Sequence, residues 1–156
     1  MKSTFEQEEV FMGLALEQAK KAMACDEVPI GAVLVQDGLV IATAFNLREQ
    51  KHNAIAHAEI LVIEEACRKL QKWRLSSCEL YVTLEPCLMC AGALVQARIK
   101  TVYFGALDPK GGALGSLYRV HEDVRLNHRF AVRGGILGKE CGALLQQFFQ
   151  KKRTRT

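Results

Sequence analysis

Residues 81–90 read YVTLEPCLMC, so an apolar run leads through a proline directly into a Cys-x-x-Cys pair. The run 79–85 has the composition of a β-strand, and proline is favoured at the first turn of a helix, which we expect over 86–97. The stretch therefore predicts a strand–turn–helix unit with both cysteines at the start of the helix. By itself, the pair Cys87 and Cys90 fits a disulfide, a redox pair, a structural metal site or half of an active site.

The segments around this unit alternate between two hydrophobic patterns. Continuous or period-two apolar runs predict strands, and apolar residues at helical spacing predict amphipathic helices. We expect strands over 29–36, 39–45, 79–85, 100–106 and within 129–137, and helices over 8–24, 57–72, 86–97 and from about Lys139 onward. Asp37-Gly38 predicts a hairpin turn, whereas 46–56 and 108–130 lack a clear period and are expected to be loops. This alternation predicts a layered α/β domain with at least partly parallel strands.

Length and composition predict a single domain over residues 1–156. The chain is 49% hydrophobic and 24% charged, which is typical of a folded rather than a disordered protein. No stretch approaches the roughly 20 apolar residues that span a membrane. The N-terminal MKSTFEQEEV also lacks the apolar core of a signal peptide. We therefore expect a cytoplasmic protein with no membrane partner.

The charge is distributed unevenly along the chain. Residues 1–100 hold 11 Lys and Arg against 13 Asp and Glu, a net of −2, whereas residues 101–156 hold 10 against 4, a net of +6. The segment 150–156 forms a basic tail with four cations and no acid. This asymmetry favours a polyanionic partner such as nucleic acid, and its plainer explanation is a solvated basic tail.

The six cysteines are not expected to form disulfides, because the cytoplasm is reducing. Four of them have apolar or helical neighbours and are expected to be small core residues: Cys25, Cys67, Cys78 and Cys141. Cys87 and Cys90 differ, because a helix N-terminus stabilises thiolates and the Cys-x-x-Cys spacing lets both sulfurs reach one ion.

A zinc site with one nitrogen and two sulfur ligands is predicted from His57, Cys87 and Cys90. A catalytic zinc ion takes three protein ligands and leaves its fourth position for water. The sequence has no second Cys-x-x-Cys pair that would complete a closed structural site, so an open catalytic site is favoured. Glu59 then fits a proton carrier beside the metal, and its plainer explanation is an acid in the first turn of a helix.

The pattern H-x-E…P-C-x-x-C is the signature of zinc-dependent nucleobase deaminases, and cytidine, guanine and pterin-type deaminases share it. Further stretches resemble the bacterial tRNA-specific adenosine deaminases, in family order over about residues 6–153. They are EVPIGAVLV, AFN, AHAE, TLEPCLMCAGAL, VYFGALDPKGGALGS, NHR and GIL…EC…LL…FF. The segments from FGALDPKGGALGS onward favour the tRNA enzymes within this superfamily.

This resemblance implies a cytidine deaminase-like fold, a three-layer α/β/α sandwich with a central mixed five-stranded sheet flanked by helices. It implies zinc-dependent hydrolytic deamination of adenosine to inosine at the wobble position of a tRNA anticodon, that of an arginine tRNA. One Zn²⁺ ion per chain and a homodimer are implied as well, and DNA is not expected as a natural substrate. The base would enter the pocket readily because an anticodon loop is single-stranded.

The resemblance also implies substrate contacts. Asn46 would hydrogen-bond the nucleoside, Asp108 would lie near the sugar of a flanking nucleotide, and Phe149, Lys152 and Arg153 would contact RNA. Apolar residues would form the walls of the pocket: Val28, Pro29, Ala58, Leu84 and Pro86. Each has a plainer alternative, namely a turn residue for Asn46, a loop-initiating acid for Asp108, core packing for the apolar residues and a solvated tail for the cations.

Two rival functions remain. A free-base or nucleoside deaminase, such as a guanine deaminase, would use the same zinc chemistry, but the basic C-terminal half favours an RNA substrate. A non-catalytic zinc or RNA-binding module would have no use for Glu59. Salt-sensitive tRNA binding separates the first rival from the tRNA enzyme, and metal analysis with an ammonia-release assay separates the second.

Overall fold

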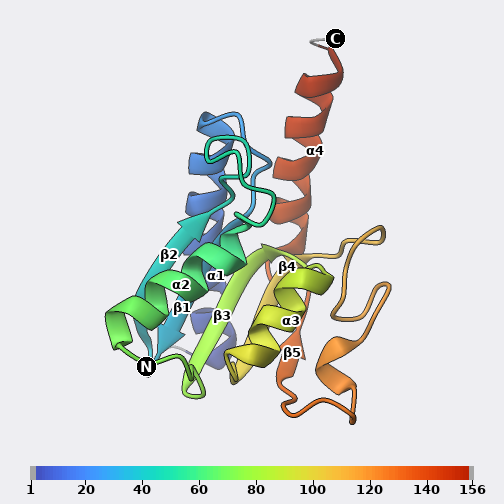
Figure 1. Cartoon of the computed structure of the whole chain (residues 1–156). Coiled ribbons are helices and arrows are strands. Elements are labelled where there is room, and N and C mark those ends of the chain that lie inside the picture. The colour runs from blue at the N-terminus through green and yellow to red at the C-terminus, as the bar shows by residue number, and fades with distance from the viewer. Residues whose placement is uncertain (1–2, 155–156) are drawn as a thin grey trace.

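A mixed five-stranded sheet in the order β2-β1-β3-β4-β5 forms the centre of the computed structural model, which describes residues 3–154 (Figure 1). The strands are β1 (Gly31–Gln36), β2 (Leu39–Phe45), β3 (Cys78–Leu84), β4 (Thr101–Ala106) and β5 (Ala131–Arg133). β1 pairs antiparallel with β2 and β3, whereas β3–β4 and β4–β5 pair in parallel. The predicted strands and the mixed sheet are confirmed.

Helices cover both faces of this sheet, so the expected three-layer sandwich is present (Figure 1). The helices are α1 (Thr4–Ala24), α2 (Ala58–Leu70), α3 (Leu88–Gln96) and α4 (Gly138–Thr154), with a short 3-10 helix η1 (Val120–Glu122) in the segment expected to be irregular. α1 and α4 pack on one face, and α2 and α3 pack on the other. None of the helices within residues 3–154 is both long and apolar enough to cross a membrane.

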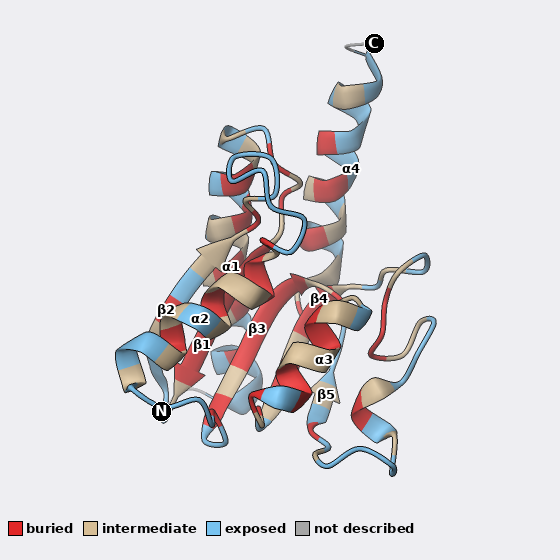
Figure 2. Ribbon diagram, in the orientation of Figure 1, coloured by how far each residue is buried: buried red, intermediate tan, exposed pale blue. Residues whose placement is uncertain are grey.

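Alternation along β1 divides the core into two layers. Ala32 and Leu34 belong to the cluster under α2 and α3, whereas Val33 and Val35 belong to the cluster under α1. Successive side chains of a strand point to opposite faces, so a central strand covered on both sides must be apolar throughout. Figure 2 shows the consequence: buried residues fill most of the central strands β1 and β3, whereas the edge strands β2 and β5 are largely exposed or intermediate.

Local sequence signals explain where the elements begin and turn. Ser3 starts α1 with a capping box, in which its hydroxyl accepts a hydrogen bond from the Glu6 N–H and the Glu6 carboxylate accepts one from the Ser3 N–H. Asp37 and Gly38 both have positive φ, 52° and 77°, as a tight hairpin turn requires. Gly31 lets α1 approach β1, because a Cβ there would lie 2.0 Å from the Ala15 carbonyl oxygen.

One edge of the sheet collects the segments that carry the predicted site. β3 and β4 are parallel, and both end there. β1 is antiparallel to β3 and therefore begins there, and β2 is antiparallel to β1 and therefore ends there. α4 extends past this same edge (Figure 1). Ligands in open α/β sheets bind beyond the carboxyl ends of the strands, so a ligand site is expected at this edge.

The basic segment 150–156 is not a separate tail over its described part. Residues 150–154 continue α4 without a break, and Arg155 lies outside the described residues. Phe148 is buried on the inner side of this helix, whereas Phe149 is 46% exposed. The cations are therefore presented by a helix and not by a free chain.

Candidate active site

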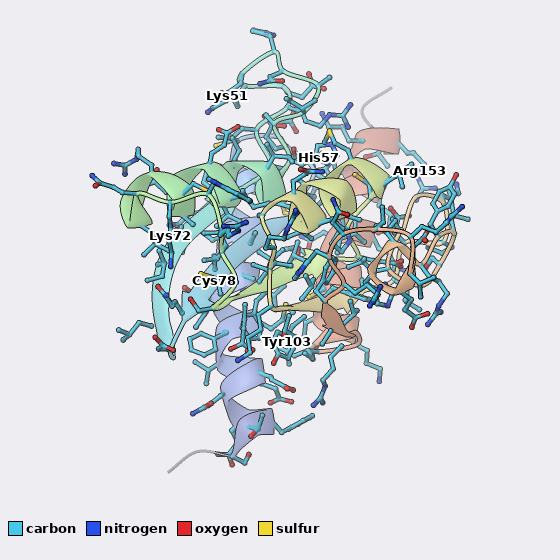
Figure 3. All side chains as sticks on the ribbon, turned by 60° about the horizontal axis from the view of Figure 1, so that its bottom comes forward. Lys51, His57, Lys72, Cys78, Tyr103 and Arg153 are labelled. Atoms are coloured by element: carbon cyan, nitrogen blue, oxygen red, sulfur yellow. The ribbon has the colours of Figure 1, made fainter. Side chains whose placement is uncertain are left out.

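The predicted metal ligands stand at the starts of two neighbouring helices. His57 is the N-cap residue of α2 and Cys87 is that of α3, both with extended backbone, and Cys90 lies in the first turn of α3. Neither His57 nor Cys87 uses its side chain to cap its own helix, so both side chains are available for another partner. Figure 3 shows His57 at the end of α2 that lies next to α3, whereas Lys72 lies beyond the opposite end.

The three side chains converge on one point. His57 Nδ1 lies 3.4 Å from the Cys90 sulfur and 3.7 Å from the Cys87 sulfur, and all three donor atoms lie within 4.8 Å of one another. No other group of three metal-ligand side chains this close occurs among residues 3–154. One nitrogen and two sulfurs are a donor set that zinc favours, so the residues fit a metal ion.

The electrostatics of the group favour a thiolate at Cys87. A hydrogen bond from Cys90, followed by one from His57, lowers the pKa of the Cys87 thiol to about 4 in spite of burial. The hydrogen bond between Cys90 and the Cys87 thiolate is the largest cause that raises the pKa of Cys90. The hydrogen bond between His57 and Cys87 is the largest cause that raises the pKa of His57. Metal ligands must be deprotonated, so a site that already holds one thiolate is prepared for a cation.

Glu59 lies next to this group although it is two residues from His57 in the helix. It is 4% exposed, and burial raises its pKa to about 7. A backbone hydrogen bond, the charge of His57 and a hydrogen bond involving Cys90 act against this shift. A carboxyl group with a pKa near neutrality can both accept and donate protons at physiological pH. The arrangement can therefore support acid–base chemistry beside a metal.

A pocket of about 180 Å³ opens beside these groups. Its lining residues are Val28, Ile30, Asn46, Arg48, His57, Glu59, Leu84, Glu85, Cys87 and Asp108. Seven of the residues predicted from the sequence thus meet at one cavity, although they come from five separate segments of the chain. Cys90 lies beneath them and is fully buried.

Three predicted wall residues do not line this pocket. Pro29 and Pro86 are buried, and Ala58 belongs to the core cluster of α2 and α3. The Pro86 carbonyl accepts a hydrogen bond from the Ala113 N–H at 2.9 Å, so this residue joins two backbone segments. Core packing, the alternative explanation, describes Ala58, and the two prolines are buried outside this lining.

Asn46 presents an unsatisfied acceptor to the pocket. Its Nδ2 donates to the Val28 carbonyl at 3.3 Å, which leaves Oδ1 buried without a partner among the described residues. The residue is 3% exposed. Buried polar atoms without a partner are uncommon and costly, so Oδ1 is well placed to accept a hydrogen bond from a ligand.

The sequence prediction missed Ile30, Arg48 and Glu85. Arg48 is an exposed cation at the mouth of the pocket, and its loop is held by Glu27, whose buried carboxylate accepts hydrogen bonds from the Glu49 and Gln50 N–H groups. Buried Glu85 has a signal in the sequence, an acid inside an otherwise apolar run. Asp108 lines the pocket and also stabilises its own turn, because Oδ1 accepts hydrogen bonds from the Lys110 and Gly111 N–H groups.

The end of α4 lies beside the pocket. Phe149 and Lys152 line a second cavity of about 400 Å³, which shares Val28 with the first. Lys152 also forms an ion pair with Asp26 at 2.8 Å. Arg153 lines a different cavity together with Phe149 and Lys152, so it is not among the residues that join α4 to the first pocket.

Comparisons with known proteins agree with this geometry. Residues 5–153 match the family described as MafB19-like deaminase. The tRNA-specific adenosine deaminase of Bacillus subtilis is 53% identical over 149 residues, which are 96% of this chain and 92% of the relative. A solved structure from a study of A-to-I editing by tRNA:A34 deaminases at the wobble position of transfer RNA is 48% identical, with a TM-score of 0.84 over 86% of this chain and 98% of the other. The guanine deaminase from Nitrosomonas europaea is 27% identical, with a TM-score of 0.79 over 90% and 83%.

Proposed function

The chain belongs to the family of tRNA-specific adenosine deaminases, and we propose that it hydrolyses adenosine to inosine at the wobble position of a tRNA anticodon, that of an arginine tRNA. In this reaction water adds at C6 of the purine and ammonia leaves, so no redox cofactor is needed. The observation that carries the proposal is the group of His57, Cys87 and Cys90 facing a pocket that also holds Glu59.

The metal that we propose for this group is a single zinc ion per chain, held by His57 Nδ1 and the two sulfurs. Bound zinc would lower the pKa of a water molecule toward neutrality and so supply the nucleophile. Glu59 would accept a proton from the attacking water at its carboxylate. It would then deliver protons to the ring nitrogen N1 and to the departing amine, as its position beside the ligands allows.

Other pocket residues would hold the nucleotide. The free Oδ1 of Asn46 would accept a hydrogen bond from the nucleoside, and Val28 and Leu84 would pack against the base. Arg48 at the pocket mouth and Lys152 in the adjoining cavity supply cations for the phosphates on either side of the flipped base. Asp108 would lie near the sugar of the neighbouring nucleotide.

The reaction would take place in the cytoplasm, where tRNA is found, and we propose a homodimer as the active form. Four large apolar side chains, each more than half exposed, offer surface for a second copy: Leu88, Leu107, Leu117 and Tyr118. They lie in α3 and in the segment 107–118, which the backbone bridge between Cys87 and Gly112 joins. Light scattering of the purified protein measures this state directly.

The test of the function compares anticodon stem-loops that are identical except at the wobble base. We expect inosine, detected by mass spectrometry of the digested RNA, from the loop with adenosine, and no deamination of loops with guanosine or cytidine. Free guanine, assayed for ammonia release in parallel, should not react. Ammonia from guanine without inosine from the stem-loop would replace this proposal with a guanine deaminase.

A further inference from the structure

Glu85 is a buried carboxylate at the active-site pocket that the proposed chemistry does not use. It follows β3 directly and lies two residues before Cys87. Its side chain is 2% exposed and lines the pocket. Burying a carboxylate is costly unless hydrogen bonds satisfy it, so its partners indicate its role.

Among residues 3–154, the hydrogen-bond donors to this carboxylate come from one loop segment, residues 108–116. Oε1 accepts from the Asp108 N–H at 3.1 Å and from the Ser116 hydroxyl, and Oε2 accepts from the Leu114 N–H at 3.1 Å and the Ser116 N–H at 3.0 Å. An ionised carboxylate offers about four acceptor sites, so this loop fills its capacity. The partners lie 23 to 31 residues away in sequence, and the contact is therefore tertiary.

The loop backbone passes directly over the carboxylate. A Cβ at Gly112 would lie 2.2 Å from the Glu85 carboxyl carbon, so glycine is required for this approach. The same stretch of loop pairs with the residues that follow Glu85: Gly112 bridges to Cys87, and the Ala113 N–H donates to the Pro86 carbonyl at 2.9 Å. Segment 108–116 is thus docked along the strand end that carries a predicted metal ligand.

We propose that Glu85 is a positioning residue, which holds segment 108–116 in the shape that places Asp108 against the pocket. The carboxylate acts through the loop and not on the reacting base, so it sets how tightly the nucleotide is bound more than the rate of the chemical step. The statement about nucleotide binding rests on the proposed function, whereas the statement about loop order does not.

Glu85→Gln tests this role with almost no change in shape. A glutamine amide replaces one acceptor oxygen with an NH₂ donor, which must then face a donor of the loop, so at least one of the four hydrogen bonds is lost. Hydrogen bonds to charged groups contribute about 1.5–3 kcal/mol, and amide exchange in 108–116 should therefore become roughly tenfold faster or more. Zinc content should stay at one per chain, and KM for the stem-loop should rise by a larger factor than kcat falls.

Glu79→Gln is the matched control, because Glu79 lies on β3, the strand that Glu85 follows, and accepts from the Tyr103 hydroxyl far from the pocket. It should leave exchange in 108–116 and KM unchanged. If Glu85→Gln does not fold, Ser116→Ala removes the hydroxyl donor and leaves the three backbone donors. It should give a smaller change in the same direction.

Three results would overturn the proposal. The first is unchanged amide exchange in 108–116 in both Glu85→Gln and Ser116→Ala. The second is loss of bound zinc together with faster exchange in this loop. The third is a fall in kcat with KM unchanged. Amide exchange is measured without RNA, so it tests the loop-order proposal independently of the proposed function. If only the proposed function fails, the unmodified protein forms no inosine, and the loop still exchanges faster in Glu85→Gln.

Discussion

The sulfur of Cys90 lies 3.4 Å from Nδ1 of His57, although 33 residues separate the two in sequence. The contact exists because α2 and α3 both begin at the edge of the sheet where β3 ends. It also shows which ring nitrogen of His57 faces the sulfurs. Nδ1 is therefore the atom placed to bind a metal.

Replacing either cysteine should remove the metal. We expect Cys87→Ser and Cys90→Ser to contain much less than one zinc per chain by elemental analysis, because two ligands hold zinc far more weakly than three. Cys67→Ala is the control, since this cysteine lies outside the group and is only partly buried. Full zinc occupancy in both serine variants would show that the ligand assignment is wrong.

Glu59→Gln should keep the metal and lose the reaction. General acid–base catalysis contributes about 10²–10⁴-fold, so kcat should fall by at least this range, and further if one carboxylate serves several proton transfers. Glu64→Gln, at an exposed position of the same helix, should retain activity. Near-normal turnover in Glu59→Gln would refute the role, whereas loss of zinc would indicate that Glu59 is a ligand.

Asn46→Ala should weaken substrate binding. The variant loses the buried Oδ1 acceptor, and a hydrogen bond of about 0.5–1.5 kcal/mol corresponds to a roughly 2- to 13-fold rise in KM for the stem-loop. Asn53→Ala changes a nearby loop amide that accepts from the Ile55 N–H outside the pocket, and its KM should not change. Equal effects of the two substitutions would mean that Asn46 only stabilises the loop.

The cations of α4 should control RNA affinity and its salt dependence. Lys151, Lys152 and Arg153 lie in the last turn of this helix, and Lys152 lines the cavity that adjoins the proposed active site. Each phosphate neutralised on single-stranded RNA contributes about −0.7 to the log–log slope of affinity against salt. Replacing all three with Ala should weaken tRNA binding and flatten this slope, with less effect on the single-turnover rate at saturating RNA.

A matched triple substitution of Lys72, Arg74 and Lys100 removes the same charge at the opposite edge of the sheet. All three are exposed, and they lie before β3 and β4 begin. This variant should bind tRNA with the original salt slope. Superimposable titrations of the two triple variants would exclude α4 from the RNA-binding surface. The cations that bind RNA would then be sought among Arg119, Arg125, Arg129 and Arg133.

His121 should make the protein less stable as the pH falls. Burial lowers the pKa of His121, and the charge of Arg119 lowers it further, whereas Glu122 and Glu85 raise it. The Nδ1 atom has no hydrogen-bond partner among the described residues. The folded state therefore favours neutral histidine, and stability that is full above the unfolded pKa of about 6.5 is lost as the pH falls through the folded pKa. His121→Leu keeps apolar packing near Phe130 and should show a smaller fall in Tm between pH 7.5 and pH 5.5. An equal fall in both proteins would assign the acid sensitivity to other groups.

The sequence alone determined the order and type of the elements and the chemistry of the metal group. Apolar periodicity, the Asp37-Gly38 turn and the proline before Cys87 are local signals, and each acts within a few residues of itself. The ligand set could be predicted for the same reason, because two helix starts supply it with recognisable residue types. The basic end of the chain was also visible from composition.

Only the tertiary structure decided which residues share the pocket and which do not. Pro29, Ala58 and Pro86 have the same apolar character as Val28 and Leu84, and their direction relative to the sheet edge separates core from pocket wall. Arg48 carries no local signal that marks it as a pocket residue, and the acid at Glu85 inside an apolar run does not show which groups it faces. Both residues reach the pocket because a hairpin and a parallel crossover bring distant loops together, and such placement depends on packing and hydrogen bonds between segments far apart in sequence.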